Sequence, residues 1–134
     1  MAYWILKTEP SAYSFDRLER DGTAVWDGVA NNLALKHLRA MHPGDEVLIY
    51  HTAEERALIG KAVVTSEPYP DPKLKDPKRA VVELRAAGRL AHAVPLATIK
   101  AVPALKELPL VRLGRLSVSP ATPAEWRELL RLAK

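Results

Sequence analysis

Residues 46–65 read EVLIYHTAEERALIGKAVVT, with two apolar stretches on either side of a short polar segment. The first stretch, residues 46–52, is a nearly unbroken apolar run that suits a strand buried on one or both faces. Residues 57–65 form a second such stretch, and residues 54–56 (EER) make the polar connection. The pattern therefore predicts two successive strands.

Short strands and helices are also predicted on both sides of this pair. We expect strands over residues 2–6, 23–26 and 80–90 with a last one near Ser117, helices over 14–20, 31–41 and 122–133, and helical turns over 96–102 and 104–108. The clearest signal is Thr122 followed by Pro123 and Glu125, the pattern of a capping box. Residues 68–78 contain four prolines, which predicts an exposed loop.

About six short strands with helices inserted between them do not alternate as a doubly wound parallel sheet requires. We therefore expect an α+β fold, a bent and mostly antiparallel β-barrel of about six strands with peripheral helices. The length of 134 residues predicts a single domain that spans residues 1–134.

Composition excludes several classes of protein. Hydrophobic residues make up 48% and charged residues 27%, as in globular domains, so wholesale disorder is excluded. No apolar run approaches the roughly 18 residues of a membrane span, and the N-terminal residues lack the pattern of a secretory signal. The absence of cysteine excludes disulfides, thiolate metal sites and cysteine nucleophiles. A cytoplasmic location with no membrane partner is the expectation that follows.

Charge is divided unevenly along the chain, whose net charge is +4. Residues 1–67 hold seven basic and ten acidic residues, whereas residues 68–134 hold thirteen basic and six acidic ones. A basic half suits a polyphosphate backbone, and a solvated surface is the alternative reading. The candidate backbone contacts are Lys73, Lys75, Lys78, Arg79, Arg89 and Arg112.

Residues that would support catalysis are sparse. No two of the four histidines have metal-ligand spacing, and the chain contains no glycine-rich phosphate loop and no GxSxG motif. We therefore expect no catalytic residue, no metal and no cofactor. A small enzyme acting on nucleotides, with His51 as the acid–base group, is the weakest alternative.

Trp26 stands out among the aromatic residues. It lies at a strand end, just before Asp27-Gly28 and close to the only two asparagines of the chain, Asn31 and Asn32. One asparagine is expected to cap the helix that follows, and either is a candidate ligand contact. An indole open to solvent beside amides and a turn is able to stack on a planar base, so we expect Trp26 at the rim of a cleft.

Several blocks of sequence resemble the EVE domain family, a branch of the PUA-like superfamily. Residues 3–10 (YWILKTEP) are similar to the family's opening, and residues 26–31 (WDGVAN) are similar to its W-D-G-V-R-N, with Ala30 in place of arginine. Further blocks follow in the family's order, namely LRAM at 38–41, GD at 44–45, YHT at 50–52, YPD at 69–71, RLSV at 115–118 and PAEW at 123–126.

The resemblance implies a PUA-like barrel with one surface pocket and no catalytic activity. It also implies recognition of a modified base in DNA or RNA, particularly a 5-methylcytosine-type base that is flipped between aromatic walls. Carried over by motif, the ligand-binding candidates are Lys7, Trp26, Gly28, Val29, Asn31, His51, Thr52, Arg115 and Ser117. The alternative within the superfamily is a general PUA-type module that binds unmodified RNA.

Overall fold

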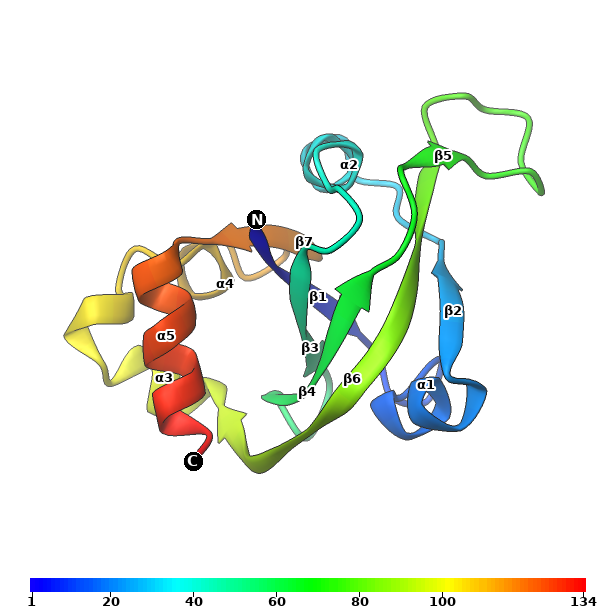
Figure 1. Ribbon diagram of the computed structural model, residues 1–134. Coiled ribbons are helices and arrows are strands. Elements are labelled where there is room, and N and C mark those ends of the chain that lie inside the picture. Colours follow the sequence, from blue (N-terminus) through cyan, green and yellow to red (C-terminus); the bar gives the residue numbers. More distant parts are fainter.

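Seven strands form one curved sheet in the computed structural model, which describes residues 1–134 (Figure 1). The strands are β1 (Tyr3–Thr8), β2 (Thr23–Trp26), β3 (Glu46–His51), β4 (Ala57–Val64), β5 (Tyr69–Pro70), β6 (Ala80–Pro95) and β7 (Val118–Ala121). Their order across the sheet is β2-β6-β4-β3-β1-β7, and β5 pairs with β6 outside this path. Only β1 and β3 run parallel, so the sheet is mostly antiparallel, as expected.

The sheet is not closed into a barrel, which corrects the sequence-based expectation. Strand β2 pairs only with β6, and β7 pairs only with β1, so both remain edge strands. The curvature comes from β6, which continues to Pro95, well beyond the predicted end near Leu90. Its pairing with β4 shifts register twice, and such bulges bend a strand without joining the two edges of its sheet.

Five α-helices and one 3₁₀ turn surround the sheet. They are α1 (Phe15–Asp21), α2 (Asn32–Arg39), α3 (Leu96–Lys100), the 3₁₀ turn η1 (Pro103–Leu105), α4 (Pro109–Arg112) and α5 (Pro123–Leu132). In Figure 1, α3, α4 and α5 gather on one side of the sheet, whereas α1 lies beside β2. Ser14, Asn31 and Thr122 cap helices by accepting a backbone hydrogen bond. Asn31 is thus the capping asparagine of the pair, and the predicted capping box of Thr122 and Glu125 is confirmed.

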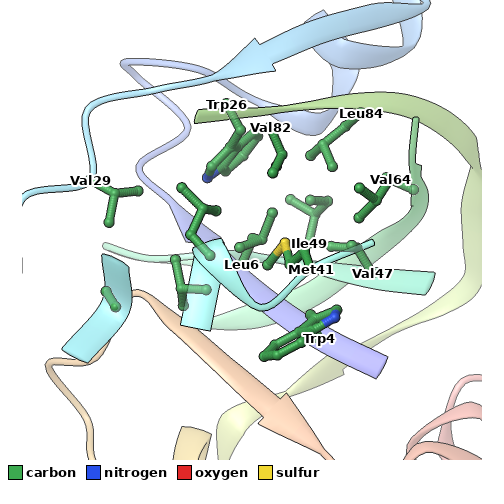
Figure 2. Close-up of a cluster of buried hydrophobic side chains, with 14 of the residues drawn as sticks. Trp4, Leu6, Trp26, Val29, Met41, Val47, Ile49, Val64, Val82 and Leu84 are labelled. Carbon is green, nitrogen blue, oxygen red and sulfur yellow. The ribbon is translucent and has the colours of Figure 1, made fainter. Parts of the chain in front are cut away.

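The central strands bury both faces, so the molecule has two hydrophobic clusters. On β1, Trp4 and Leu6 belong to one cluster while Ile5 belongs to the other, as the alternation of side chains along a strand dictates. The first cluster lies against α1 and α2 and contains Trp26 (Figure 2). The second is covered by α3, η1, α4 and α5 and contains Trp126, so Trp4 and Trp126 fill the two halves of the core.

Close packing also fixes α1 on the sheet. A Cβ added to Gly60 of β4 would lie 2.2 Å from the ring of Phe15, which is fully buried. The backbone N–H of Phe15 donates to Nε2 of His51, at 3.0 Å. Strand β4 therefore needs glycine at position 60 so that the first turn of α1 can approach it.

Asp45 is a buried carboxylate at the other end of the sheet. It accepts hydrogen bonds from the indole N–H of Trp4 at 2.9 Å and from the backbone N–H groups of Ala2 and His42. Burial by itself raises the pKa of Asp45, but the hydrogen bonds from Trp4, Ala2 and His42 outweigh it and hold the pKa below its usual value. The polar edge of Trp4 is therefore satisfied within the fold.

Candidate functional site

A cavity of about 650 Å³ opens between the end of β1, the start of α1, and β2 with the turn that follows it. Binding cavities for small molecules have volumes of a few hundred to about 1,000 Å³, so one base fits. The lining residues are Lys7, Thr8, Ala12, Tyr13, Arg17, Asp21, Thr23, Ala24, Val25, Trp26, Asp27, Gly28, Val29, Lys73 and Ser117. Five of the nine predicted ligand-binding residues are among them, namely Lys7, Trp26, Gly28, Val29 and Ser117.

Trp26 lines this cavity but most of its ring is buried, so the prediction of an indole open to solvent was wrong. Its side chain is 8% exposed and packs into the first cluster beside Val82 (Figure 2). Trp26 is a large residue at the end of an edge strand, and the curvature of β6 folds that end over the core. The concavity expected next to it does exist.

The indole N–H of Trp26 has no acceptor within the protein. The only buried side-chain nitrogen or oxygen without a partner is Oγ of Ser119, so the indole nitrogen of Trp26 is reached by solvent. Figure 2 shows this nitrogen on the side of the ring toward Val29, which also lines the cavity. Trp26 therefore offers the cavity a hydrogen-bond donor together with part of its aromatic surface.

Tyr13 forms a second aromatic wall. Its ring meets that of Trp26 edge-on, with centroids 6.2 Å apart and an angle of 83° between the planes. Its hydroxyl donates to Oδ2 of Asp21 at 2.9 Å. Burial, together with the Asp21 carboxylate, raises the pKa of Tyr13 to about 12. The hydroxyl therefore stays protonated at neutral pH and holds the ring in place.

The turn after β2 supplies backbone and carboxylate groups. Gly28 has a φ of 79°, which glycine adopts without the strain that a side chain would add. The carbonyl of Val29 accepts a hydrogen bond from Nε of Arg79 at 3.1 Å, so the end of the proline-rich loop is tied to this turn. The Asp27 side chain is exposed at the cavity and makes no ion pair. It is a free acceptor.

Lys7 stands at the far side of the cavity, near the end of β1. Its Nζ donates to the carbonyl oxygen of Gly114 at 2.6 Å, and its backbone N–H donates to that of Ser117. Burial lowers the pKa of the Lys7 ammonium. A half-buried cation with no carboxylate partner stabilises an anionic ligand that enters next to it.

Four predicted binding residues lie outside this cavity. The side chain of Asn31 caps α2 by accepting a hydrogen bond from the backbone N–H of Ala34. Asn31 and Arg115 both line a separate hollow. His51 is 4% exposed, and both its ring nitrogens are engaged, by the Phe15 N–H and by the carboxylate of Glu55 at 2.7 Å. Thr52 faces a different cavity. The structure thus gives Asn31 and His51 positions that support α2 and α1.

The residues predicted to contact the nucleic-acid backbone divide into cations without an ion pair and cations paired with carboxylates. Lys73 lines the cavity, and Lys75 and Lys78 are exposed on the same proline-rich loop without ion pairs. Arg79 binds the Val29 carbonyl, as described above. Two predicted contacts are instead paired with carboxylates, Arg89 with Asp16 and Glu19, and Arg112 with Glu107 at 2.8 Å.

Six polar or aromatic lining residues were not predicted, namely Thr8, Tyr13, Arg17, Asp21, Thr23 and Asp27. Two of them had a signal in the sequence, because Tyr13 is an aromatic in a turn and Asp27 lies inside the W-D-G motif. The others come together only because the helix α1 folds back beside β2. No group of three or more His, Asp or Glu side chains is placed to hold a metal ion. No helix has both the length and the apolar character needed to cross a membrane.

Fold and cavity together define a small α+β domain with one base-sized hollow beside a tryptophan. The model of the EVE domain family matches residues 2–132, so the chain belongs to the EVE domain family. The family predicted from the sequence blocks is therefore confirmed.

Individual proteins are also similar to this chain. Mouse thymocyte nuclear protein 1 is 29% identical over 97% of this chain and 73% of its own length. The solved structure of a Rhodopseudomonas palustris protein is 37% identical, covers 99% of this chain and 93% of its own, and superposes with a TM-score of 0.94. Human THYN1, solved in complex with DNA that contains 5-methylcytosine, is 28% identical, with coverage of 100% and 98% and a TM-score of 0.92.

Proposed function

We propose that this protein binds nucleic acid carrying a modified base of the 5-methylcytosine type, and that a flipped base enters the cavity beside Trp26 without being chemically changed. The observation that carries this proposal is the superposition, over the whole chain, with human THYN1 in complex with 5-methylcytosine DNA. The PUA-like character of the fold is part of the proposal, with an open sheet in place of a barrel. The single domain and the cytoplasmic location remain predictions of the sequence.

Trp26 and Tyr13 supply the aromatic contacts of the proposed site. Contact between a base and an aromatic ring contributes about 1–3 kcal/mol, which offsets the few kcal/mol that extrusion of the base costs. The unpartnered indole N–H of Trp26 adds a donor for a ring nitrogen or carbonyl of the base. A 5-methyl group placed against this apolar surface contributes roughly 0.8 kcal/mol. That is only a several-fold preference, so polar groups must reject other bases.

We propose that Asp27 is the polar group that discriminates against other bases. A carboxylate accepts a hydrogen bond from the exocyclic amino group of cytosine. Thymine carries the same methyl group but has a carbonyl oxygen at that position, which a carboxylate does not bind. The site is therefore expected to prefer 5-methylcytosine over thymine although the two bases have nearly the same shape.

The test is a binding titration of fluorescent single-stranded oligonucleotides that differ in one central base, which is 5-methylcytosine, cytosine or thymine. Trp26→Ala should weaken binding of the methylated strand by about 5- to 150-fold, the range that one base–aromatic contact supplies. Asp27→Asn should reduce the ratio of affinities for 5-methylcytosine and thymine. Trp26→Phe keeps the ring and serves as the control for folding, and thermal unfolding of each variant is measured in parallel.

Unchanged affinity in folded Trp26→Ala protein would refute the proposal. Equal affinity for unmodified RNA, insensitive to Trp26→Ala, would instead support the general RNA-binding module. Conversion of the bound base in any of these mixtures would contradict the absence of catalysis.

A further inference from the structure

A second cavity, of about 220 Å³, lies on the other side of Lys7. Its polar lining comes from Lys7, Tyr50, Thr52, Arg56 and Lys100, and its apolar lining includes Leu96, Leu110 and Val111. Lys7 lines both cavities, so the two hollows adjoin at this residue. Nothing in the proposed base recognition uses Tyr50, Arg56 or Lys100.

The second cavity has the charge of an anion site. Lys7, Arg56 and Lys100 contribute three cations, and no carboxylate is among the lining residues. None of the three is within 4.0 Å of a carboxylate, so they are not neutralised by ion pairs. The nearest acidic residues in sequence, Glu54 and Glu55, line an adjoining hollow that shares Arg56, Leu96 and Lys100 with the second cavity. Neither carboxylate lies within 4.0 Å of Arg56 or Lys100, and Glu55 is bound to His51.

The structure holds Arg56 and Lys100 in a fixed relation. The carbonyl of Arg56 accepts a hydrogen bond at 2.8 Å from Leu96, the first residue of α3, and Lys100 is the last residue of that helix. Ala53 and Arg56 have φ values of 65° and 46°. Left-handed backbone is uncommon for residues other than glycine and is retained where the surroundings impose it. The turn between β3 and β4 therefore fixes the backbone of Arg56, from which its exposed side chain lines the second cavity.

Lys7 and Tyr50 line the second cavity together with Arg56. Nζ of Lys7 lies 5.7 Å from the centre of the Tyr50 ring, and Tyr50 is 3% exposed. Burial raises the pKa of Tyr50 even though the neighbouring Arg56 opposes this shift, so its hydroxyl remains a donor. An anion in the second cavity would thus meet cations on several sides, and no carboxylate lines that cavity.

We propose that the second cavity binds a phosphate group, and that in the complex with nucleic acid this is a backbone phosphate next to the base held in the first cavity. The proposal rests on the proposed function for the identity of the macromolecule, but the charge of the cavity stands independently of it. Arginine and lysine on phosphate oxygens fix the register of a bound strand. Lys7 then links the two sites, because it contacts a ligand in either one.

The first experiment measures the affinity for the 5-methylcytosine strand at several salt concentrations. Arg56→Ala combined with Lys100→Ala should weaken binding about tenfold and make the slope of log K against log salt shallower by about one, because one phosphate contact is lost. The ratio of affinities for methylated and unmethylated strands should not change. Lys106→Ala combined with Arg127→Ala is the matched control, since it removes two exposed cations that line neither cavity.

The second experiment titrates inorganic phosphate into the protein and follows the backbone amide NMR signals of residues 53–56 and of Lys100. Phosphate should shift these signals in the wild-type protein and in Trp26→Ala, and it should not shift them in Arg56→Ala/Lys100→Ala. A free phosphate site without a role in strand binding would show this shift together with unchanged strand affinity, and it would overturn the assignment to the backbone.

The outcomes separate the two proposals. Loss of binding in Trp26→Ala with an unchanged salt slope in Arg56→Ala/Lys100→Ala would leave the proposed function standing and overturn the phosphate site. An equal effect of the Lys106→Ala/Arg127→Ala control would also overturn it, since net charge would then suffice. If Trp26→Ala has no effect, the proposed function fails. The phosphate titration then decides whether the second cavity binds phosphate. An absence of signal shifts in that titration would refute the phosphate site.

Discussion

Trp4 and Trp26 are buried to nearly the same extent, at 6% and 8% exposed, but their polar edges are treated differently. The indole N–H of Trp4 donates to Asp45 at 2.9 Å, inside a carboxylate site that binds two further N–H groups. The indole N–H of Trp26 has no acceptor in the protein and faces the larger cavity. Burial alone therefore does not distinguish a purely structural tryptophan from one proposed to bind a base, and the polar edge without a partner beside a cavity is what sets Trp26 apart.

The largest difference between the two regions should appear in the free energy of unfolding when the carboxylate beside each tryptophan is removed. Asp45→Ala leaves three N–H donors unpaired in the interior, and we expect it to lower the free energy of unfolding by about 3–5 kcal/mol. Asp27→Ala, at the exposed carboxylate beside Trp26, should change it by no more than about 0.5 kcal/mol. Urea unfolding of both variants measures the difference. Equal losses would show that the Trp26 region is as closed as the Trp4 region.

Replacement of each tryptophan by phenylalanine isolates the indole N–H. Trp4→Phe leaves the Asp45 carboxylate without one of its donors and should cost about 1–3 kcal/mol of stability, with no effect on strand affinity. Trp26→Phe breaks no hydrogen bond within the protein and should change stability less. Thermal and urea unfolding of the pair provides the comparison, and a larger stability loss in Trp26→Phe would contradict it.

Affinity for the 5-methylcytosine oligonucleotide should show the opposite order to stability, with the larger effect in the Trp26 variant. Trp26→Phe keeps an aromatic wall but removes the donor, so we expect affinity for the 5-methylcytosine strand to fall by about 2- to 10-fold, the worth of one hydrogen bond. Trp4→Phe should bind as the wild-type protein does. Fluorescence anisotropy titrations on the two folded variants test this expectation, and it fails if both lose affinity equally.

Acid should destabilise the protein in part through Asp45, beside Trp4. The pKa of Asp45 lies below its ordinary value in the folded protein, so its contribution to stability is complete above the unfolded pKa and is lost as pH falls through the folded one. We expect Asp45→Asn to flatten the acid limb of the stability profile. Denaturation midpoints between pH 2 and 6 provide the check, and an identical acid limb in variant and wild type would argue against this role.

Much of the fold was predictable because its signals are local. The apolar runs at 46–52 and 57–65 became β3 and β4, and the cap at Thr122 was predicted from the short pattern Thr122-Pro123-Glu125. Closure of the sheet was not predictable in this way. Whether β2 reaches β7 depends on the bending of β6, which is set by register shifts that leave no mark on strand periodicity.

The site was predictable only where it is continuous in sequence. Trp26, Gly28 and Val29 are neighbours along the chain and line the cavity together. His51 was assigned to the ligand because a motif carries no information on the direction of a side chain, and the structure turns it toward the N-terminus of α1. Tyr13 and Asp21 reach the cavity through the packing of α1 against the sheet, which becomes visible only in three dimensions.

The claim on which this account depends is that a base enters the cavity beside Trp26, and the chain's three tryptophans allow a direct test. The indole N–H signals of Trp4, Trp26 and Trp126 are resolved in a ¹⁵N-edited NMR spectrum during titration with the 5-methylcytosine strand. The account predicts a large shift of the Trp26 signal at saturation and little change in the other two. A Trp26 signal that stays in place while the strand is bound would contradict it.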